Sequence, residues 1–142
     1  MAEIITEGLA AEMGLEGLEV RSAGTGAVRG FPASGGAQRA AGRNGLNLAG
    51  HSSTPLTPEL VDWASRIFTM SPFHLQRVQE MGGGEGSFLL GAFAMGEDEE
   101  VGAQWSVPDP FGRDDRDYED TFKTLREYVR MALKRLAREA EA

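Results

Sequence analysis

The chain has 142 residues, a formal net charge of −8 and 41% apolar residues, which suits one domain with a sizeable core. The negative charge argues against binding to nucleic acid or an anionic membrane. There is no signal-peptide pattern or membrane-spanning apolar run, so we expect a cytoplasmic protein. With no cysteine and two histidines, the sequence excludes a disulfide, cysteine chemistry within these residues and a His-rich metal site, and we expect neither metal nor cofactor.

The first half of the chain predicts two helices with one strand between them. Apolar residues recur at helical spacing over residues 2–13, and Gly14 follows at a position typical of a helix end. Residues 18–22 alternate apolar and polar side chains before a glycine loop, which predicts a strand. Residues 32–44 are rich in alanine and predict a short helix.

The middle of the chain predicts two more helices and two more strands. Thr57 and Ser71 each precede a proline and then a periodic run, which is typical of a helix N-cap followed by proline. We expect a strand over residues 64–70, a helix over 72–81 and a short strand over 87–90.

The end of the chain predicts an acidic loop and a long helix. Residues 96–102 carry four consecutive acids and are expected to be solvated. An apolar stripe runs from Tyr118 to Leu136, with acids crowding the start of this helix and basic residues its end, as the helix dipole favours.

Strands that alternate with helices predict an α/β fold with a parallel sheet. In such sheets ligands bind beyond the carboxyl ends of the strands, so the loop at residues 22–26 and the junction at 70–71 are candidate site walls. Only three strands are found, however, and a chain that starts with a helix lacks an opening strand.

An acid held between two prolines stands out in residues 107–112. Pro108 and Pro110 stiffen the loop and keep Asp109 extended, as proton transfer at a fixed place would require. The same residues are also typical of a plain turn in which Asp109 accepts a local backbone hydrogen bond. The hexapeptide alone leaves both interpretations open.

The order of these segments resembles the low-molecular-weight protein phosphatase family. The resemblance extends from Met1 to about Leu136. Seven pieces match in order: residues 1–3 opening a helix, 21–25 after a strand, Pro32, 50–53, 69–70 with His74 beyond, 107–112 and Tyr118.

The resemblance implies a three-layer α/β/α fold, Rossmann-like with a small parallel sheet, as a single domain over residues 1–142. It also implies an N-terminal truncation. In the family a first strand leads into a Cys-x5-Arg phosphate-binding loop, which would precede Met1. The nucleophilic cysteine and the phosphate-binding arginine are therefore not in this chain, and its first strand is missing.

The resemblance further implies roles for residues that are present. Asp109 is expected to be the general acid and base. The residues expected to line the substrate cleft, or to support those that line it, are Ser22, His51, Pro110 and Phe111. For His51 a plain loop histidine is an equal alternative. Trp105 and Tyr118 are either rim residues or ordinary packing, and His74 is expected to be structural.

Two functions follow from these expectations. The first is a phosphatase that hydrolyses phosphotyrosine or phosphoarginine on proteins through a cysteinyl-phosphate, so that the 142 residues alone are inactive. The second is a non-catalytic binding or scaffold protein that keeps the fold. The Asp-Pro-Phe-Gly form of the loop at residues 109–112 favours the bacterial branch that includes protein-arginine phosphatases. An arsenate reductase of related fold is a weaker alternative, because it would need further cysteines and the sequence has none.

The resemblance also places the missing strand inside the sheet, between residues 18–22 and 64–70. Each backbone group left unpaired and buried costs ~1–3 kcal/mol, against a net domain stability of ~5–15 kcal/mol. We therefore expect that the chain is not a stable monomer, and that strand pairing with a neighbour, such as a strand-swapped homodimer, fills the gap.

Overall fold

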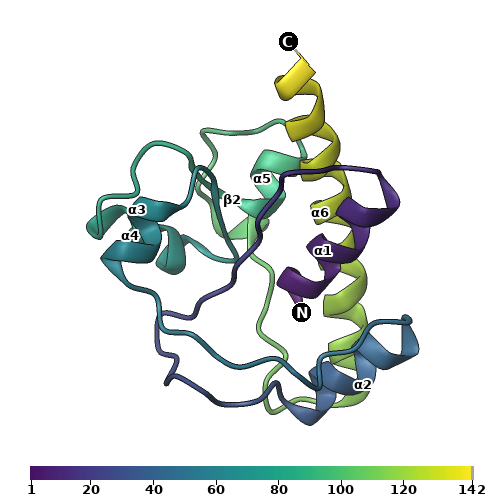
Figure 1. Ribbon diagram of the computed structural model, residues 1–142. Coiled ribbons are helices and arrows are strands. Elements are labelled where there is room, and N and C mark those ends of the chain that lie inside the picture. Colours follow the sequence, from purple (N-terminus) through teal and green to yellow (C-terminus); the bar gives the residue numbers. More distant parts are fainter. Residues whose placement is uncertain (142) are drawn as a thin grey trace.

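The computed structural model describes residues 1–141 and shows helices on both sides of a small sheet (Figure 1). The helices α3 and α4 lie on one side, and α1, α5 and α6 lie on the other. In chain order the elements are α1 (Ala2–Glu12), α2 (Gly35–Arg43), α3 (Pro58–Trp63), β1 (Ile67–Thr69), α4 (Pro72–Glu80), β2 (Ser87–Leu89), α5 (Leu90–Ala94), the 3-10 helix η1 (Ala103–Trp105) and α6 (Asp115–Glu141). The predicted α/β class with three layers is confirmed.

Both predicted proline-led helix starts are present. The Thr57 hydroxyl accepts the Leu60 N–H at 3.2 Å, and the Ser71 hydroxyl accepts the His74 N–H at 3.3 Å. Each hydroxyl satisfies an N–H that the first turn of a helix leaves unpaired. The second cap matters for the site, because it turns the chain directly after β1.

The sheet consists of β1 and β2, which run parallel with Ile67 opposite Ser87 and Thr69 opposite Leu89. The Ile67 N–H donates to the Gly86 carbonyl at 2.8 Å. Both strands lie within the ranges that the sequence predicts, and both are shorter. The second ends early because Leu90 begins α5, a helix that the sequence pattern does not predict.

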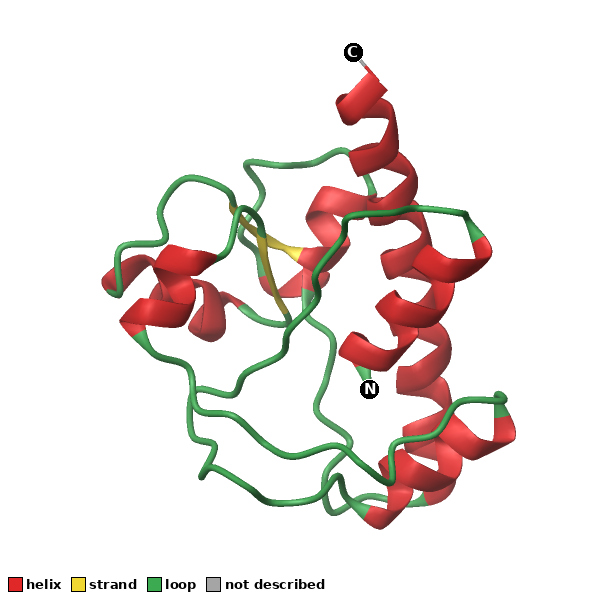
Figure 2. Cartoon of the chain, viewed as in Figure 1, coloured by secondary structure: helices red, strands yellow, loops and turns green. Residues whose placement is uncertain are grey.

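The predicted strand at residues 18–22 is wrong. The segment is a loop (Figure 2), and among residues 1–141 none forms a backbone hydrogen bond with residues 16–22. A strand requires a neighbour that offers a matching row of N–H and C=O groups. The alternating pattern is present, but β1 does not pair with it.

The core centres on α6, whose apolar stripe packs against α1, α2 and α5. Asp114 begins this helix by accepting the Asp117 N–H at 3.0 Å. The predicted long helix is confirmed and is longer than the apolar stripe. No described helix is long and apolar enough to cross a membrane.

Candidate active site

The loop that carries Asp109 is tied to the end of β1. The Val107 N–H donates to the Met70 carbonyl at 2.7 Å, directly after the last residue of the strand. Val107 and Pro110 are buried, whereas Pro108 and Asp109 are exposed. The proline-clamped acid is therefore carried past the carboxyl end of a parallel strand, where ligands of such sheets bind.

Asp109 makes the local turn that one of the two interpretations predicts. Its Oδ1 accepts the Phe111 N–H at 3.0 Å. No hydrogen bond from the described residues reaches its Oδ2, and the residue is exposed. Phe111 beside it is 76% exposed, an unusual position for a large aromatic side chain. The turn fixes the carboxylate and leaves one oxygen available, so the two interpretations are compatible.

Glu3 joins two of the other predicted site residues. The Ser22 hydroxyl donates to Glu3 Oε1 at 2.9 Å, and His51 Nδ1 lies 3.9 Å from Glu3 Oε2. Glu3 stands in the first turn of α1, where a carboxylate also complements the helix dipole. The sequence had suggested no role for Glu3 in the site. An acid in the first turn of a helix was the available signal, but it did not reveal the long-range partners.

The predicted aromatic rim is only partly present. Tyr118 is 5% exposed, and its hydroxyl accepts a hydrogen bond from Ser34 at 3.0 Å, so it belongs to the core. Trp105 packs against the small cluster of Leu75, Leu89 and Ala92. The packing alternative therefore holds for both.

His74 pairs with the cap residue of its own helix, because its Nδ1 lies 3.0 Å from the Ser71 hydroxyl. This supports the structural role that was expected. Both residues also line a large cavity at the end of β1.

This cavity, of about 1490 Å³, lies between β1, residues 17–27, the start of α1, and α6. Ser22, Asp109 and Pro110 line it, whereas His51 and Phe111 stand outside its lining. The predicted site residues thus gather around one opening, on its wall or beside it. Among the described residues no group of three or more His, Cys, Asp or Glu side chains could hold a metal ion.

The amino group of Met1 belongs to the same region, since Met1 lines the cavity. Burial lowers the pKa of this α-amino group, and the nearby Glu3 carboxylate partly offsets the shift. Burial in this wall therefore disfavours the charged form of the amino group.

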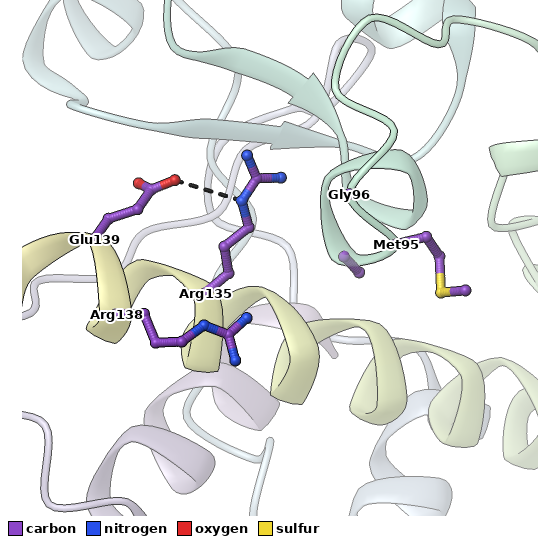
Figure 3. Close-up of a pocket in the computed structure, with 6 residues that line it drawn as sticks. Met95, Gly96, Arg135, Arg138 and Glu139 are labelled. Carbon is purple, nitrogen blue, oxygen red and sulfur yellow. Dashed lines mark ion pairs between the residues drawn. The ribbon is translucent and has the colours of Figure 1, made fainter.

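A second hollow of about 550 Å³ lies between the end of α5 and α6, away from Asp109 (Figure 3). Its central cation, Arg135, is already engaged. It forms a forked ion pair with Asp98, a 3.4 Å pair with Glu139, and stacks 4.0 Å over the Phe93 ring. This arrangement stabilises the packing of α6, and it engages the Arg135 guanidinium within the protein.

Comparison with known proteins identifies the family. The pattern that describes the low molecular weight phosphotyrosine protein phosphatases matches residues 1–142. The chain belongs to this family. The predicted family is thereby confirmed, and so is the resemblance from which the site residues were inferred.

Individual members agree with this assignment. A crystal structure of a YwlE mutant from Bacillus subtilis superposes with a TM-score of 0.84 at 31% identity, covering 96% of this chain and 88% of that one. A YwlE arginine phosphatase with a cysteine-to-serine mutation and a phosphorylated active-site serine gives 0.83 at 31% identity, with 96% and 86% covered. A probable low molecular weight protein-tyrosine-phosphatase, EpsP of Ralstonia solanacearum, is 29% identical over 81% of this chain and 74% of its own length.

Proposed function

We propose that this chain carries the acid–base part of a phosphatase that hydrolyses phosphotyrosine or phosphoarginine on cytoplasmic proteins. One observation carries the proposal. The 2.7 Å hydrogen bond from Val107 to Met70 holds Asp109 beyond the carboxyl end of β1, at the edge of the cavity. A general acid must stand within reach of its proton acceptor in a fixed place, and this loop provides such a place.

The proposed reaction has two steps. A cysteine thiolate attacks phosphorus and the bond from phosphorus to the leaving oxygen or nitrogen breaks, while Asp109 gives its proton to the leaving atom. Water then attacks the cysteinyl-phosphate, Asp109 takes a proton from the water, and the thiolate leaves with inorganic phosphate as the product. Because the 142 residues contain no cysteine, the nucleophile has to come from outside them.

The similar YwlE arginine phosphatase supports this scheme by analogy. After its cysteine-to-serine mutation, the active-site serine of that protein carries the phosphate. EpsP of Ralstonia solanacearum is instead a probable tyrosine phosphatase. We therefore keep both phosphotyrosine and phosphoarginine as proposed substrates.

The remaining predicted residues have supporting roles in the proposal. Ser22 and His51, gathered by Glu3, brace the wall next to the reacting phosphate. Pro110 anchors the acid loop, and the exposed Phe111 ring contacts the substrate chain at the rim. No step requires a cofactor.

The test compares this chain with a form extended at Met1 by the strand and Cys-x5-Arg loop of YwlE. We expect no turnover of aryl phosphate, phosphotyrosine peptide or phosphoarginine by the 142 residues alone, and turnover by the extended form. In the extended form, Asp109→Asn should lower turnover by about 10²–10⁴-fold, most strongly for poor leaving groups.

Asp114→Asn is the matched control. Asp114 caps α6, and asparagine also caps helices, so this variant should keep full turnover. An unchanged rate in Asp109→Asn would remove Asp109 from the mechanism. The alternative function is a binding protein that retains the fold, and the lack of cysteine in the 142 residues favours it. A folded extended form that binds phosphopeptide without turnover would support this alternative.

A further inference from the structure

A loop beside the candidate site is held in place by one residue. Residues 28–31 directly follow the stretch 22–27, which lines the same cavity as Asp109. Isolated bridges join the chain on either side of this loop to a second segment, pairing residue 24 with 55 and residue 32 with 52 (Figure 1). The loop therefore begins at the wall of the site and lies against the segment that follows His51.

Ser53, in that second segment, forms four hydrogen bonds with the loop. Its N–H donates to the Phe31 carbonyl at 2.7 Å, and its carbonyl accepts the Gly30 N–H at 2.9 Å. Its hydroxyl accepts the Phe31 N–H at 2.9 Å and donates to the Val28 carbonyl. Because these bonds satisfy backbone groups that have no regular secondary structure, the conformation of residues 28–31 is fixed before a partner binds.

The fixed loop presents its side chains to solvent. Val28 is 65% exposed and Phe31 is 61% exposed, and Arg29 between them is also exposed. Two large apolar side chains kept in water contribute little to the stability of the fold. A partner that covers them gains apolar contact and loses little conformational entropy, because the loop is already ordered.

Charge indicates which partner fits this loop. The chain has a formal net charge of −8, yet residues 20–58 contain four arginines and no aspartate or glutamate. Three of these arginines pair with acids outside the stretch, namely Arg21 with Glu19, Arg39 with Asp115, and Arg43 with Asp115 and Glu119. Arg29 forms no ion pair and no side-chain hydrogen bond within the described residues. An unpaired cation in a stretch without acids is complementary to an anionic side chain of a partner.

We propose that Arg29 is a specificity-determining residue that pairs with an acidic side chain next to the phosphorylated residue of a protein substrate. Ser53 is the positioning residue that holds the loop of Arg29, and Val28 and Phe31 cover apolar parts of the same substrate segment. This recognition presupposes the proposed function, because the partner is the phosphoprotein substrate of that site. It narrows the substrate class to phosphoproteins with an acidic residue beside the phosphorylated one.

The test measures peptide binding to the extended form described above, with the cysteine of its added loop replaced by alanine so that no turnover occurs. Two peptides are compared, Glu-Glu-phosphotyrosine-Leu-Leu and Gln-Gln-phosphotyrosine-Leu-Leu, and a second pair carries phosphoarginine in the central place. An exposed ion pair gives a modest gain. We therefore expect the glutamate peptide of a pair to bind about two- to fivefold more tightly than the glutamine peptide.

A pair of arginine variants locates the preference. Arg29→Gln should bind the glutamate and glutamine peptides equally. Arg138→Gln is the matched control, because Arg138 is also exposed and lines the second hollow, away from Asp109. This control should keep the full preference for the glutamate peptide.

Three serine variants test the positioning role. Ser53→Ala should weaken binding of the glutamate peptide by about three- to tenfold, reduce its preference over the glutamine peptide, and speed amide exchange at Phe31. Ser53→Thr keeps a hydroxyl and should restore all three properties. Ser52→Ala is the neighbouring control, because the Ser52 hydroxyl forms no hydrogen bond within the described residues. A role of Ser53 in stability alone would leave the preference between the peptides unchanged.

Four outcomes would each overturn the inference: equal binding of the two peptides, an unchanged preference in Arg29→Gln, an unchanged preference in Ser53→Ala, or no binding of any peptide. Turnover by the extended form that keeps its cysteine tests the proposed function separately. Turnover without the peptide preference would overturn the inference alone. The preference without turnover would support the inference and contradict the proposed function.

Discussion

The two edges of β1 differ sharply although they belong to one strand. The edge that faces β2 is closed by parallel pairing, and behind it the rings of Phe68 and Phe88 each lie 4.9 Å from Phe93. The edge that faces residues 17–23 opens into a cavity. A strand is therefore defined by its neighbours as much as by its own residues. Residues 18–22 have a strand pattern and remain a loop because no backbone pairs with them.

The largest expected effect is a difference in stability between alanine variants of two leucines, one in β2 and one in the loop that lines the cavity. Leu89 is 1% exposed in β2, and Leu89→Ala should lower the free energy of unfolding by about 2–5 kcal/mol through the cavity it leaves. Leu18 is 44% exposed and lines the existing cavity, so Leu18→Ala should cost less than about 1 kcal/mol. Urea unfolding of both variants measures the difference, and equal losses would contradict the contrast.

A smaller contrast comes from two glycines. Gly86 has a φ of +78°, and an added Cβ would lie 2.8 Å from the Ser65 carbonyl, so Gly86→Ala should cost about 1–3 kcal/mol. Gly26 lines the cavity with nothing within 4 Å of an added Cβ, so Gly26→Ala should be neutral or stabilise by up to about 1 kcal/mol. Thermal unfolding should rank the variants in this order. A destabilised Gly26→Ala would show that the cavity wall closes around residue 26 in solution.

The smallest expected effect is a dependence on pH at the open edge. Burial lowers the pKa of the Met1 α-amino group below 8.0 in the folded chain, so the unfolded chain binds more protons between the two pKa values. The free energy of unfolding should therefore rise as the pH increases through that window to about 8 and fall as the pH decreases. Denaturation curves across this range measure the slope. N-terminal acetylation should flatten it, and an unchanged slope would show that the Met1 α-amino group is not its source.

The sequence predicts those elements whose signals are local. The caps at Thr57 and Ser71 and the stripe of α6 depend on neighbouring residues, and all are found as expected. The strand at residues 18–22 depends on a partner that the sequence pattern does not specify. The helix α5 continues the apolar run of β2 without a turn signal, so no local feature separated the two.

The candidate site shows the same division. Asp109 stands out in the sequence because two prolines flank it, and its Asx turn follows from the same residues. The gathering of Ser22 and His51 around Glu3 links α1 with two distant loops. Such contacts arise from the fold. The family resemblance suggested His51 in advance, whereas Ser22 was suggested both by the resemblance and by its place in the predicted loop at residues 22–26.

The hydrogen bond between Val107 and Met70 makes the position of Asp109 independent of the side chains around it. Both partners in this bond are main-chain groups, so the loop keeps its attachment whatever side chains it carries, provided that residue 107 is not proline. Substitutions at the exposed Phe111 therefore leave the main-chain attachment of the Asp109 loop unchanged. A loop attached in this way can diversify among relatives, or in the laboratory, without rebuilding the sheet behind it.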